Sequence, residues 1–281
     1  MDNGLGTIIA ITNQKGGVGK TTTSVNLAAS LAATKRRVLL IDLDPQGNAT
    51  MGSGVDKHTA QTSIYDVLVE ERAISAVAVA AGQAGFSLLP SNDDLTGAEI
   101  ALLDLPQREQ RLKLALNAAR HDYDYILIDC PPSLNMLTLN ALVAAEAVLI
   151  PMQCEYYALE GLTALMKTVD KIRATLNPEL RVAGVLRTMF DPRNNLANDV
   201  SAQLVAHFGD RVYRTVIPRN VRVAEAPSHG LPVLLYDKNS RGAQAYLALA
   251  GEILRRAEEG RTAAGDAATD DERQQDQPVN Q

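Results

Sequence analysis

The run Lys15-Gly16-Gly17-Val18-Gly19-Lys20-Thr21-Thr22 decides how the rest of this sequence is interpreted. In the phosphate-binding loop pattern G-x-x-x-x-G-K-[ST], glycines let backbone N–H groups face a phosphate chain, the lysine contacts the β- and γ-phosphates, and the hydroxyl binds Mg²⁺. Gly19, Lys20 and Thr21 occupy the last three positions of that pattern, whereas Gln14 replaces its first glycine. Lys15 is a further cation that one phosphate chain does not obviously require, which suggests a second subunit.

The sequence on either side of this loop is typical of a strand and a helix. Residues 7–12 form a short apolar run rich in β-branched side chains, and residues 22–33 repeat apolar side chains at helical spacing. A strand, a glycine-rich turn and a helix in that order place bound phosphates at a helix N-terminus, where unpaired N–H groups attract anions. We therefore expect the phosphate site to be lined by Lys15, Gly16, Gly17, Val18, Gly19, Lys20, Thr21 and Thr22.

Strand-like runs alternate with helical stretches along most of the chain. The predicted strands are residues 7–12, 37–42, 86–90, 125–129, 147–151, 181–189 and 212–217. The larger predicted helices are residues 63–68, 106–120, 159–176, 196–208 and 240–258. Such alternation is typical of a parallel sheet covered on both faces by helices. The sequence therefore predicts an α/β fold of the P-loop NTPase type, with a mainly parallel, twisted sheet of about seven to eight strands.

Three loops that follow predicted strands should converge on one crevice, because ligands in such sheets bind beyond the carboxyl ends of the strands. They are residues 15–22, 42–48 and 129–133. Phosphoryl transfer needs Mg²⁺ and a polar group that orients the attacking water. Thr21 is the expected direct Mg²⁺ ligand, and Asp129, at the end of an apolar strand, is the expected carboxylate for the metal or its waters. A simple turn aspartate before two prolines is the alternative for Asp129.

Composition favours one domain. The 281 residues contain no evident linker or internal repeat, and 46% are hydrophobic, which is ample for a buried core. We divide the chain into a short lead at 1–6, one domain at 7–259, and an acidic polar tail at 260–281 that should be disordered. No apolar run reaches membrane-spanning length and the start lacks a signal peptide, so a cytoplasmic protein is expected. Cys130 and Cys154 should be ordinary reduced residues.

Charge is unevenly distributed along the chain. The formal net charge is −6, yet residues 181–222 hold seven arginines, no lysine and only three aspartates. From residue 257 onward there are seven acidic residues and two arginines. The arginine-rich stretch could contact phosphates, since the guanidinium group presents a planar fork of donors. Arginine clusters also serve solvated faces and ion pairs, so charge alone leaves both possibilities open.

Five separate blocks resemble the deviant Walker A ATPases, and within them the ParA/Soj chromosome- and plasmid-partitioning family. The blocks are KGGVGKTTTSVNLA at 15–28, DLDPQGNAT at 42–50, YILIDCPPSL at 125–134, PMQCEYYALEGL at 151–162, and IPRNVRVAEAPSHGLPV at 217–233. The resemblance spans about residues 7–255. It implies a slow, Mg²⁺-dependent ATPase whose cofactors are ATP and Mg²⁺.

The resemblance also implies roles for individual residues near the phosphates. Asp44 would position or polarise the attacking water close to the metal, with Asp42 in support, although either could merely cap or turn the loop. Lys15 would cross to the phosphates of the other subunit in an ATP-bound sandwich homodimer, unless it is only a solvated lysine. Lys15, Lys20 and Asp44 are thus the expected catalytic residues, and Thr21, Asp44 and Asp129 the expected metal site.

Base recognition is expected away from the loop. By resemblance, Pro218, Arg219 and Asn220 would lie against the adenine, with Asn220 as a hydrogen-bond partner; a plain turn after a strand is the alternative. The sequence has no GTP-type base-recognition motif such as NKxD. Apart from that, only the family resemblance favours ATP over GTP.

The resemblance further implies partners for the dimer. Arg193 and Arg222 match positions that carry non-specific contacts to double-stranded DNA, which would associate the protein with the nucleoid. A ParB/Spo0J-type centromere-binding protein would stimulate hydrolysis and release the dimer from DNA. No sequence-specific operator binding is expected, because no helix-turn-helix precedes the first strand.

Two other functions fit the same scaffold. A MinD-like ATPase that positions cell division on a membrane would need an amphipathic C-terminal helix with apolar and basic faces, and residues 255–281 are polar and acidic. A metabolic ATPase, such as a nitrogenase iron protein or an anion pump, would need cluster cysteines or a second phosphate loop. The sequence therefore favours partitioning, with the MinD-like function as the alternative.

Overall fold

A computed structural model describes residues 5–275, and its centre is one eight-stranded sheet in the order β3-β4-β2-β5-β1-β6-β7-β8. Only β3 runs antiparallel to its neighbour, β4, and all other adjacent strands are parallel. The strands are β1 (Thr7–Ile11), β2 (Val38–Asp42), β3 (Val79–Ala80), β4 (Ser87–Leu89), β5 (Tyr125–Asp129), β6 (Ala147–Gln153), β7 (Arg181–Phe190) and β8 (Val212–Pro218).

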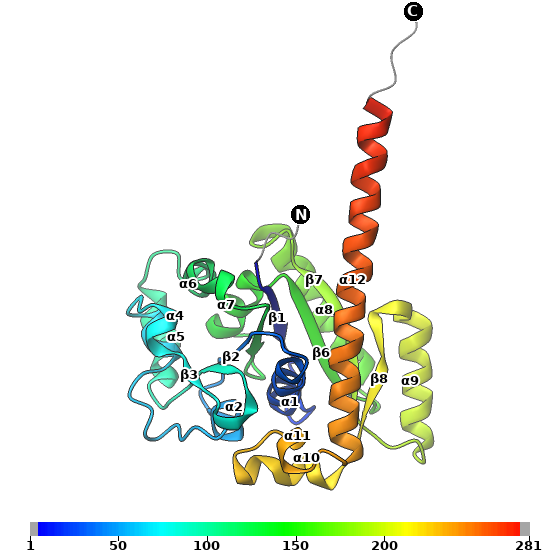
Figure 1. The fold of residues 1–281 in the computed structure, drawn as a ribbon, viewed down its shortest axis with the longest axis horizontal. Helices are drawn as coiled ribbons and strands as arrows, with labels where there is room; N and C mark the ends of the chain where they lie inside the picture. The colour runs from blue at the N-terminus through cyan, green and yellow to red at the C-terminus, as the bar shows by residue number, and fades with distance from the viewer. Residues whose placement is uncertain (1–4, 276–281) are drawn as a thin grey trace, which may run out of the picture.

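Helices cover both faces of this sheet (Figure 1). They are α1 (Lys20–Ala33), α2 (Asn48–Gly52), α3 (Ile64–Leu68), α4 (Ile74–Val77), α5 (Leu95–Leu103), α6 (Arg111–Ala119), α7 (Met136–Ala144), α8 (Ala158–Thr175), α9 (Asn195–Phe208), α10 (Val221–Glu225), α11 (Val233–Tyr236) and α12 (Arg241–Gln275). Helices α3 to α9 pack on one face, and α1, α11 and α12 pack on the other.

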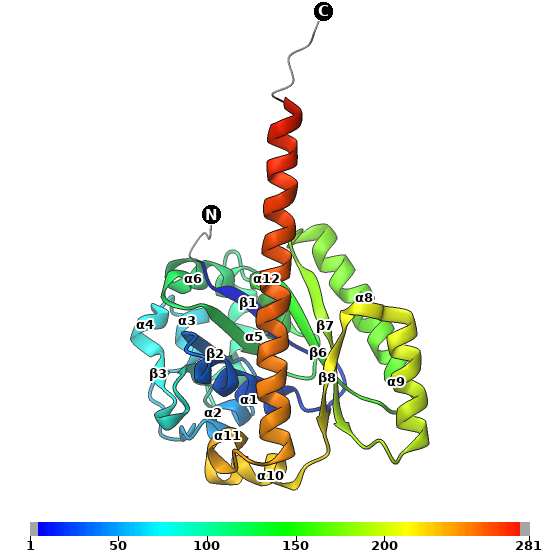
Figure 2. The ribbon, with the colours of Figure 1, turned by 45° about the vertical axis from the view of Figure 1, so that its right-hand side comes forward.

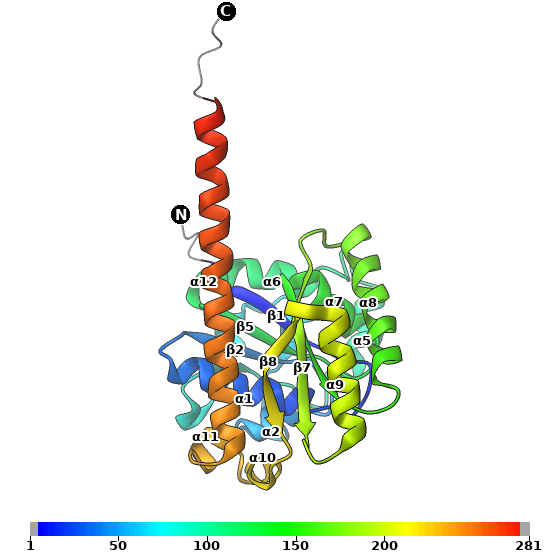
Figure 3. The same cartoon turned by 90° about the vertical axis from the view of Figure 1, so that its right-hand side faces the viewer.

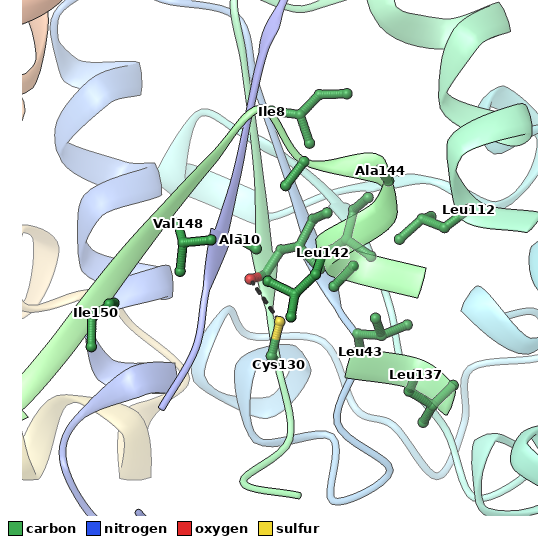
Figure 4. Close-up of a cluster of buried hydrophobic side chains, with 14 of the residues drawn as sticks. Ile8, Ala10, Leu43, Leu112, Cys130, Leu137, Leu142, Ala144, Val148 and Ile150 are labelled. Atoms are coloured by element: carbon green, nitrogen blue, oxygen red, sulfur yellow. Dashed lines mark hydrogen bonds between the residues drawn. The ribbon is translucent and has the colours of Figure 1, made fainter. Parts of the chain in front are cut away.

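The period-two alternation of side chains along each strand produces two separate cores. In β1, Ile8 and Ala10 join the core beneath α3 to α9, whereas Ile9 and Ile11 join the core beneath α1 and α12. Figure 4 shows part of the first core, in which Ile8 and Ala10 lie among side chains from α6, α7 and β6. Cys130 belongs to this core, and both cysteines are buried and unpaired, as expected.

The predicted mainly parallel sheet is confirmed, and the seven predicted strands agree with the structure to within two residues at each end. The eighth strand, β3, is only two residues long and was not expected. The helix predicted at 106–120 begins only at Arg111, because the backbone turns at Gln107, whose φ is 52°, and the Gln110 N–H donates to the Gln107 carbonyl.

The tail differs from the expectation of disorder beyond residue 259. Helix α12 continues without a break to Gln275 and extends past the body of the molecule, as Figures 1, 2 and 3 show. Nine of residues 260–275 are Ala, Arg, Gln or Glu, which favour helix, so low hydrophobicity there does not prevent helix formation. Residues 276–281 lie outside the described part of the chain. Within residues 5–275, no helix has both the length and the apolar character to cross a membrane.

Candidate functional site

The glycine-rich loop connects the end of β1 to the start of α1, as predicted. Gly17 and Gly19 have φ angles of 72° and 85°, in the left-handed region that glycine adopts without steric cost. Gly19 directly precedes α1, and no side chain caps that helix end. The first N–H groups of α1 are therefore free of side-chain caps and available to an anion.

Two polar residues that belong to no recognised motif hold the loop in place. Asn13 donates from Nδ2 to the Pro151 carbonyl at 2.8 Å and accepts the Lys15 N–H at 3.0 Å. Thr188, near the end of β7, donates its hydroxyl to the Val18 carbonyl at 2.7 Å. Both side chains are buried. In the sequence, only one feature points to these two residues: each is a polar residue at or near the carboxyl end of an apolar strand.

Lys20 begins α1 with 7% of its surface exposed and donates from Nζ to the Lys15 carbonyl at 3.2 Å. Burial lowers the pKa of Lys20, while the nearby carboxylates of Asp129 and Asp44 oppose that shift. A buried ammonium held by a single carbonyl at the base of the loop is placed to receive a negatively charged ligand.

Asp129 and Asp42 lie side by side, because β5 and β2 pair in register at these two residues. Both side chains are completely buried. The pKa of Asp129 is raised mainly by burial and secondly by the neighbouring Asp42 carboxylate. Burial also raises the pKa of Asp42. Two adjacent buried carboxyl groups cannot both ionise without a large cost in free energy, which a cation bound beside them would offset.

The surroundings of Asp129 fit such a cation. Its Oδ1 accepts the Ser24 hydroxyl at 2.8 Å, and its buried Oδ2 has no partner that meets hydrogen-bond geometry, although the Thr21 hydroxyl is near enough to lower the pKa of Asp129. Within residues 5–275, no group of three or more His, Cys, Asp and Glu side chains could hold a metal ion by itself. Mg²⁺ commonly binds through one or two protein groups together with substrate phosphates and waters, and the residues present match that mode.

The two aspartates that follow β2 have different surroundings. Asp42 Oδ2 accepts both the N–H and the hydroxyl of Thr50 at 2.7 Å, and its Oδ1 accepts the Asp44 N–H at 3.3 Å. Asp42 thereby anchors the segment 44–50 and matches the alternative of a loop-capping residue. Asp44 is buried at the same edge of the sheet, and its Oδ1 accepts the Gln46 N–H at 3.0 Å.

The Lys15 side chain is exposed to solvent. Its ammonium pairs with Glu155, which follows β6, and both side chains are about half-exposed. In the single chain this lysine therefore has an acidic partner.

Pro218 ends β8 at the carboxyl edge of the sheet, and Arg219 and Asn220 follow it. Asn220 caps α10, because its Oδ1 accepts the Val223 N–H at 3.2 Å, and it packs closely against Gly242 at the start of α12. Arg219 is exposed. This cap agrees with the alternative interpretation, in which the segment is a plain turn after a strand. The Nδ2 group of Asn220 is not used by the cap and can still act as a hydrogen-bond donor.

The predicted DNA-contacting arginines are exposed near the carboxyl ends of β7 and β8. Arg193 makes two side-chain bonds to Asp191, at 2.9 and 2.8 Å, and these bonds lower the pKa of Asp191 to about 2. Arg222 pairs with Glu225 at 2.9 Å and with Asp237 at 3.5 Å. Arg181 begins β7, at the opposite end of that strand, so the arginine-rich stretch does not form one surface.

Comparisons with known proteins agree with this geometry. A family model described as an AAA domain matches residues 6–182. The sporulation initiation inhibitor protein Soj of Bacillus subtilis is 55% identical over 249 residues, which cover 89% of this chain and 98% of Soj. The chromosome partitioning protein ParA of Caulobacter vibrioides is 54% identical over 251 residues, covering 89% and 94%.

Solved structures show the same fold. Cobyrinic acid a,c-diamide synthase from Mycobacterium smegmatis, with bound ADP and magnesium, has a TM-score of 0.79 and 39% identity, covering 91% of this chain and 97% of that one. The septum site-determining protein MinD from Pyrococcus horikoshii, complexed with Mg-ADP, has a TM-score of 0.74 and 26% identity, covering 90% and 98%. With relatives at this identity over nearly all of their length, the chain belongs to the ParA/Soj family of chromosome-partitioning ATPases, which have the P-loop NTPase fold.

Proposed function

We propose that this protein is an ATP-driven DNA-partitioning switch, in which two copies enclose ATP and Mg²⁺, bind DNA without sequence preference, and separate after hydrolysis. The observation that carries the ATPase part is the buried, unpartnered Oδ2 of Asp129, within electrostatic reach of Lys20 at the base of the loop. Phosphates and a divalent cation would satisfy both groups at once.

Each site residue has a task in this reaction. Lys20 neutralises the β- and γ-phosphates, and the N–H groups of residues 16–22 hold the phosphate oxygens. Thr21 and Asp129 would hold Mg²⁺ or its waters, and the metal would supply positive charge beside the phosphate oxygens. Asp44 positions the attacking water, supported by Asp42 through the segment 44–50. Pro218, Arg219 and Asn220 contact the adenine.

The exposed position of Lys15 supports the dimer. Its half-exposed ammonium is paired with Glu155 rather than with any group of the loop, and in the dimer it would leave Glu155 for the phosphate chain of the other subunit. A cation supplied across an interface stabilises the charge that develops on the transferring phosphoryl group. Because ATP then binds the dimer better than the single chain, nucleotide and association are linked.

DNA binding by the dimer rests on Arg193 and Arg222. Each is exposed and already paired with an acidic side chain, so DNA phosphates must compete with those pairs. Binding by one subunit is therefore weak, and a dimer doubles the number of contacts. Each phosphate neutralised steepens the salt dependence of DNA binding by about 0.9 in log–log slope. The protein would act in the cytoplasm on the nucleoid, where a ParB/Spo0J-type partner stimulates hydrolysis.

Sedimentation tests this proposal. The purified protein is measured with ADP, with ATP and with a non-hydrolysable analogue, each with and without random-sequence DNA. We expect single chains with ADP, dimers with the analogue, and DNA binding by dimers alone. DNA binding without nucleotide, or single chains at saturating analogue, would contradict the switch. Parallel samples with anionic lipid vesicles distinguish the MinD-like alternative, which requires vesicle binding with ATP.

A further inference from the structure

Helix α5 presents an apolar surface to solvent. Its inner residues Leu95, Ala98 and Leu102 are fully buried in the core beneath α3 to α9. On the outer side, Ile100 is 74% exposed and Leu103 is 52% exposed. The helix thus has two apolar faces, of which only one is covered, and packing within the chain does not account for the outer one.

Acidic residues flank this outer face. Asp93 and Asp94 precede the helix, Asp104 follows it, and all three are exposed. We call Ile100, Leu103 and these three aspartates the α5 ridge. The helix itself carries no lysine or arginine. Apolar side chains between carboxylates fit a segment that carries apolar and cationic side chains, and they disfavour an acidic or nucleic-acid partner.

The segment leading into α5 touches the loop that carries Asp44. Ser91, which is completely buried, donates its hydroxyl to the Asp44 carbonyl at 2.9 Å. Its N–H donates to the Thr50 hydroxyl, also at 2.9 Å, and Thr50 in turn bonds to Asp42. A shift of the α5 N-terminus would therefore move both ends of the segment 44–50.

A second contact connects α5 to the loop after Asp129. Glu99 of α5 accepts a hydrogen bond from Nδ2 of Asn135. Asn135 caps α7 by accepting the Thr138 N–H at 3.0 Å, and it lies six positions after Asp129 in the chain. Leu134, next to Asn135, is a further exposed apolar side chain. Both loops that carry the site carboxylates are thus bonded to α5 or to the residues just before it.

We propose that the α5 ridge is the docking surface for the protein that stimulates ATP hydrolysis, and that this partner presents a cationic segment with apolar side chains. This inference rests on the function proposed above. Docking on the ridge acts on Asp44 through Ser91 and on the Asp129 loop through Glu99. Glu99 is a positioning residue here, because it acts on the site only through Asn135.

ATP turnover with and without the ParB-type partner tests the proposal. The double variant Ile100→Ser with Leu103→Ser removes the apolar part of the ridge, and Gly97→Arg places a cation on the helix where a Cβ meets no atom within 4 Å. We expect basal turnover to stay within about twofold of wild type, and partner affinity to fall by about tenfold or more, as is typical when apolar anchors are lost. Leu114→Ser, at an exposed leucine of α6, is the matched control and should keep full stimulation.

The contact to Asn135 is tested separately. Glu99→Ala should bind the partner with wild-type affinity yet lose most of the stimulation, because the connection to the Asp129 loop is gone. Glu99→Gln keeps an acceptor oxygen and should restore stimulation, which a general loss of stability would not reproduce.

Three outcomes would overturn the inference. Wild-type stimulation of the Ile100/Leu103 double variant would place the partner elsewhere. Loss of the ATP-dependent dimer in that variant would make the ridge a contact between copies of this chain. If the partner failed to stimulate even the wild-type protein, the partner step of the proposed function would itself be wrong. The wild-type sample is enough to identify this outcome.

Discussion

Replacing Thr50 with valine should separate the anchoring role of Asp42 from catalysis. Thr50 is completely buried, and its hydroxyl donates to Asp42 while accepting the Ser91 N–H. Valine has nearly the same shape but offers neither bond. The Thr50 N–H still reaches Asp42, so one of the two bonds between these residues survives.

The expected loss of stability follows from the two broken bonds. A hydrogen bond to a charged group contributes about 1.5–3 kcal/mol, and a buried N–H left without an acceptor costs about 1–3 kcal/mol. The extra buried methyl group of valine offsets about 1 kcal/mol. We therefore expect the free energy of unfolding to fall by about 1.5–5 kcal/mol. ATP affinity should be nearly unchanged and turnover reduced, since the segment carrying Asp44 is less firmly held.

Denaturant unfolding, followed by nucleotide binding and turnover under native conditions, measures these effects. Thr163→Val is the matched control, because its exposed hydroxyl bonds only to the Leu159 carbonyl of its own helix, and it should change stability by less than about 0.5 kcal/mol. Thr50→Ser keeps the hydroxyl and should recover most of the turnover. If Thr50→Val were as stable and as active as the control, the anchoring role of Asp42 would be refuted.

Three further changes test other parts of the account. Lys20→Ala should lose ATP binding by about tenfold to a hundredfold or more, because the phosphates lose their buried cation; unchanged affinity in a direct binding titration would remove Lys20 from the site. Gly16→Val should fold normally, since a Cβ there meets no atom within 4 Å, but its ATP-bound form should stay a single chain because added bulk blocks a second subunit; a normal dimer would show that no second backbone comes close. Arg193→Glu with Arg222→Glu should form the ATP dimer and lose DNA in a gel-shift assay, and retained DNA binding would place the interface elsewhere.

Much of the fold and the phosphate loop could be predicted because their signals are local. The apolar runs of β1, β2 and β5 are continuous, as buried parallel strands require, and the loop pattern fixes Gly19, Lys20 and Thr21 by spacing alone. Parallel pairing then brings Asp42 beside Asp129, which follows once the strand order is known. Helices α2, α4, α10 and α11 were not predicted, because four or five residues are too few to show a period. The nine-residue helices α5 and α7 were also missed, because their mostly apolar sequences show no clear period.

The supports of the site could not be predicted because their partners are distant in sequence. Thr188 bonds to Val18 across 170 positions, and Asn13 bonds to Pro151 across 138. A lone threonine or asparagine has no distinctive spacing, so only the folded chain reveals these contacts. The pairing of Arg222 with Asp237 was hidden for the same reason, and a count of arginines therefore overstated the free positive charge.

The central claim is that ATP joins two copies of this chain, each supplying Lys15 to the phosphates of the other. Sedimentation of Asp44→Ala at saturating Mg²⁺–ATP tests it most directly, because loss of the water-positioning carboxylate should let the nucleotide persist. The account predicts a stable dimer at micromolar concentration, and single chains when Lys15→Ala is added to the same variant. Single chains of Asp44→Ala itself, with nucleotide bound, would contradict the claim.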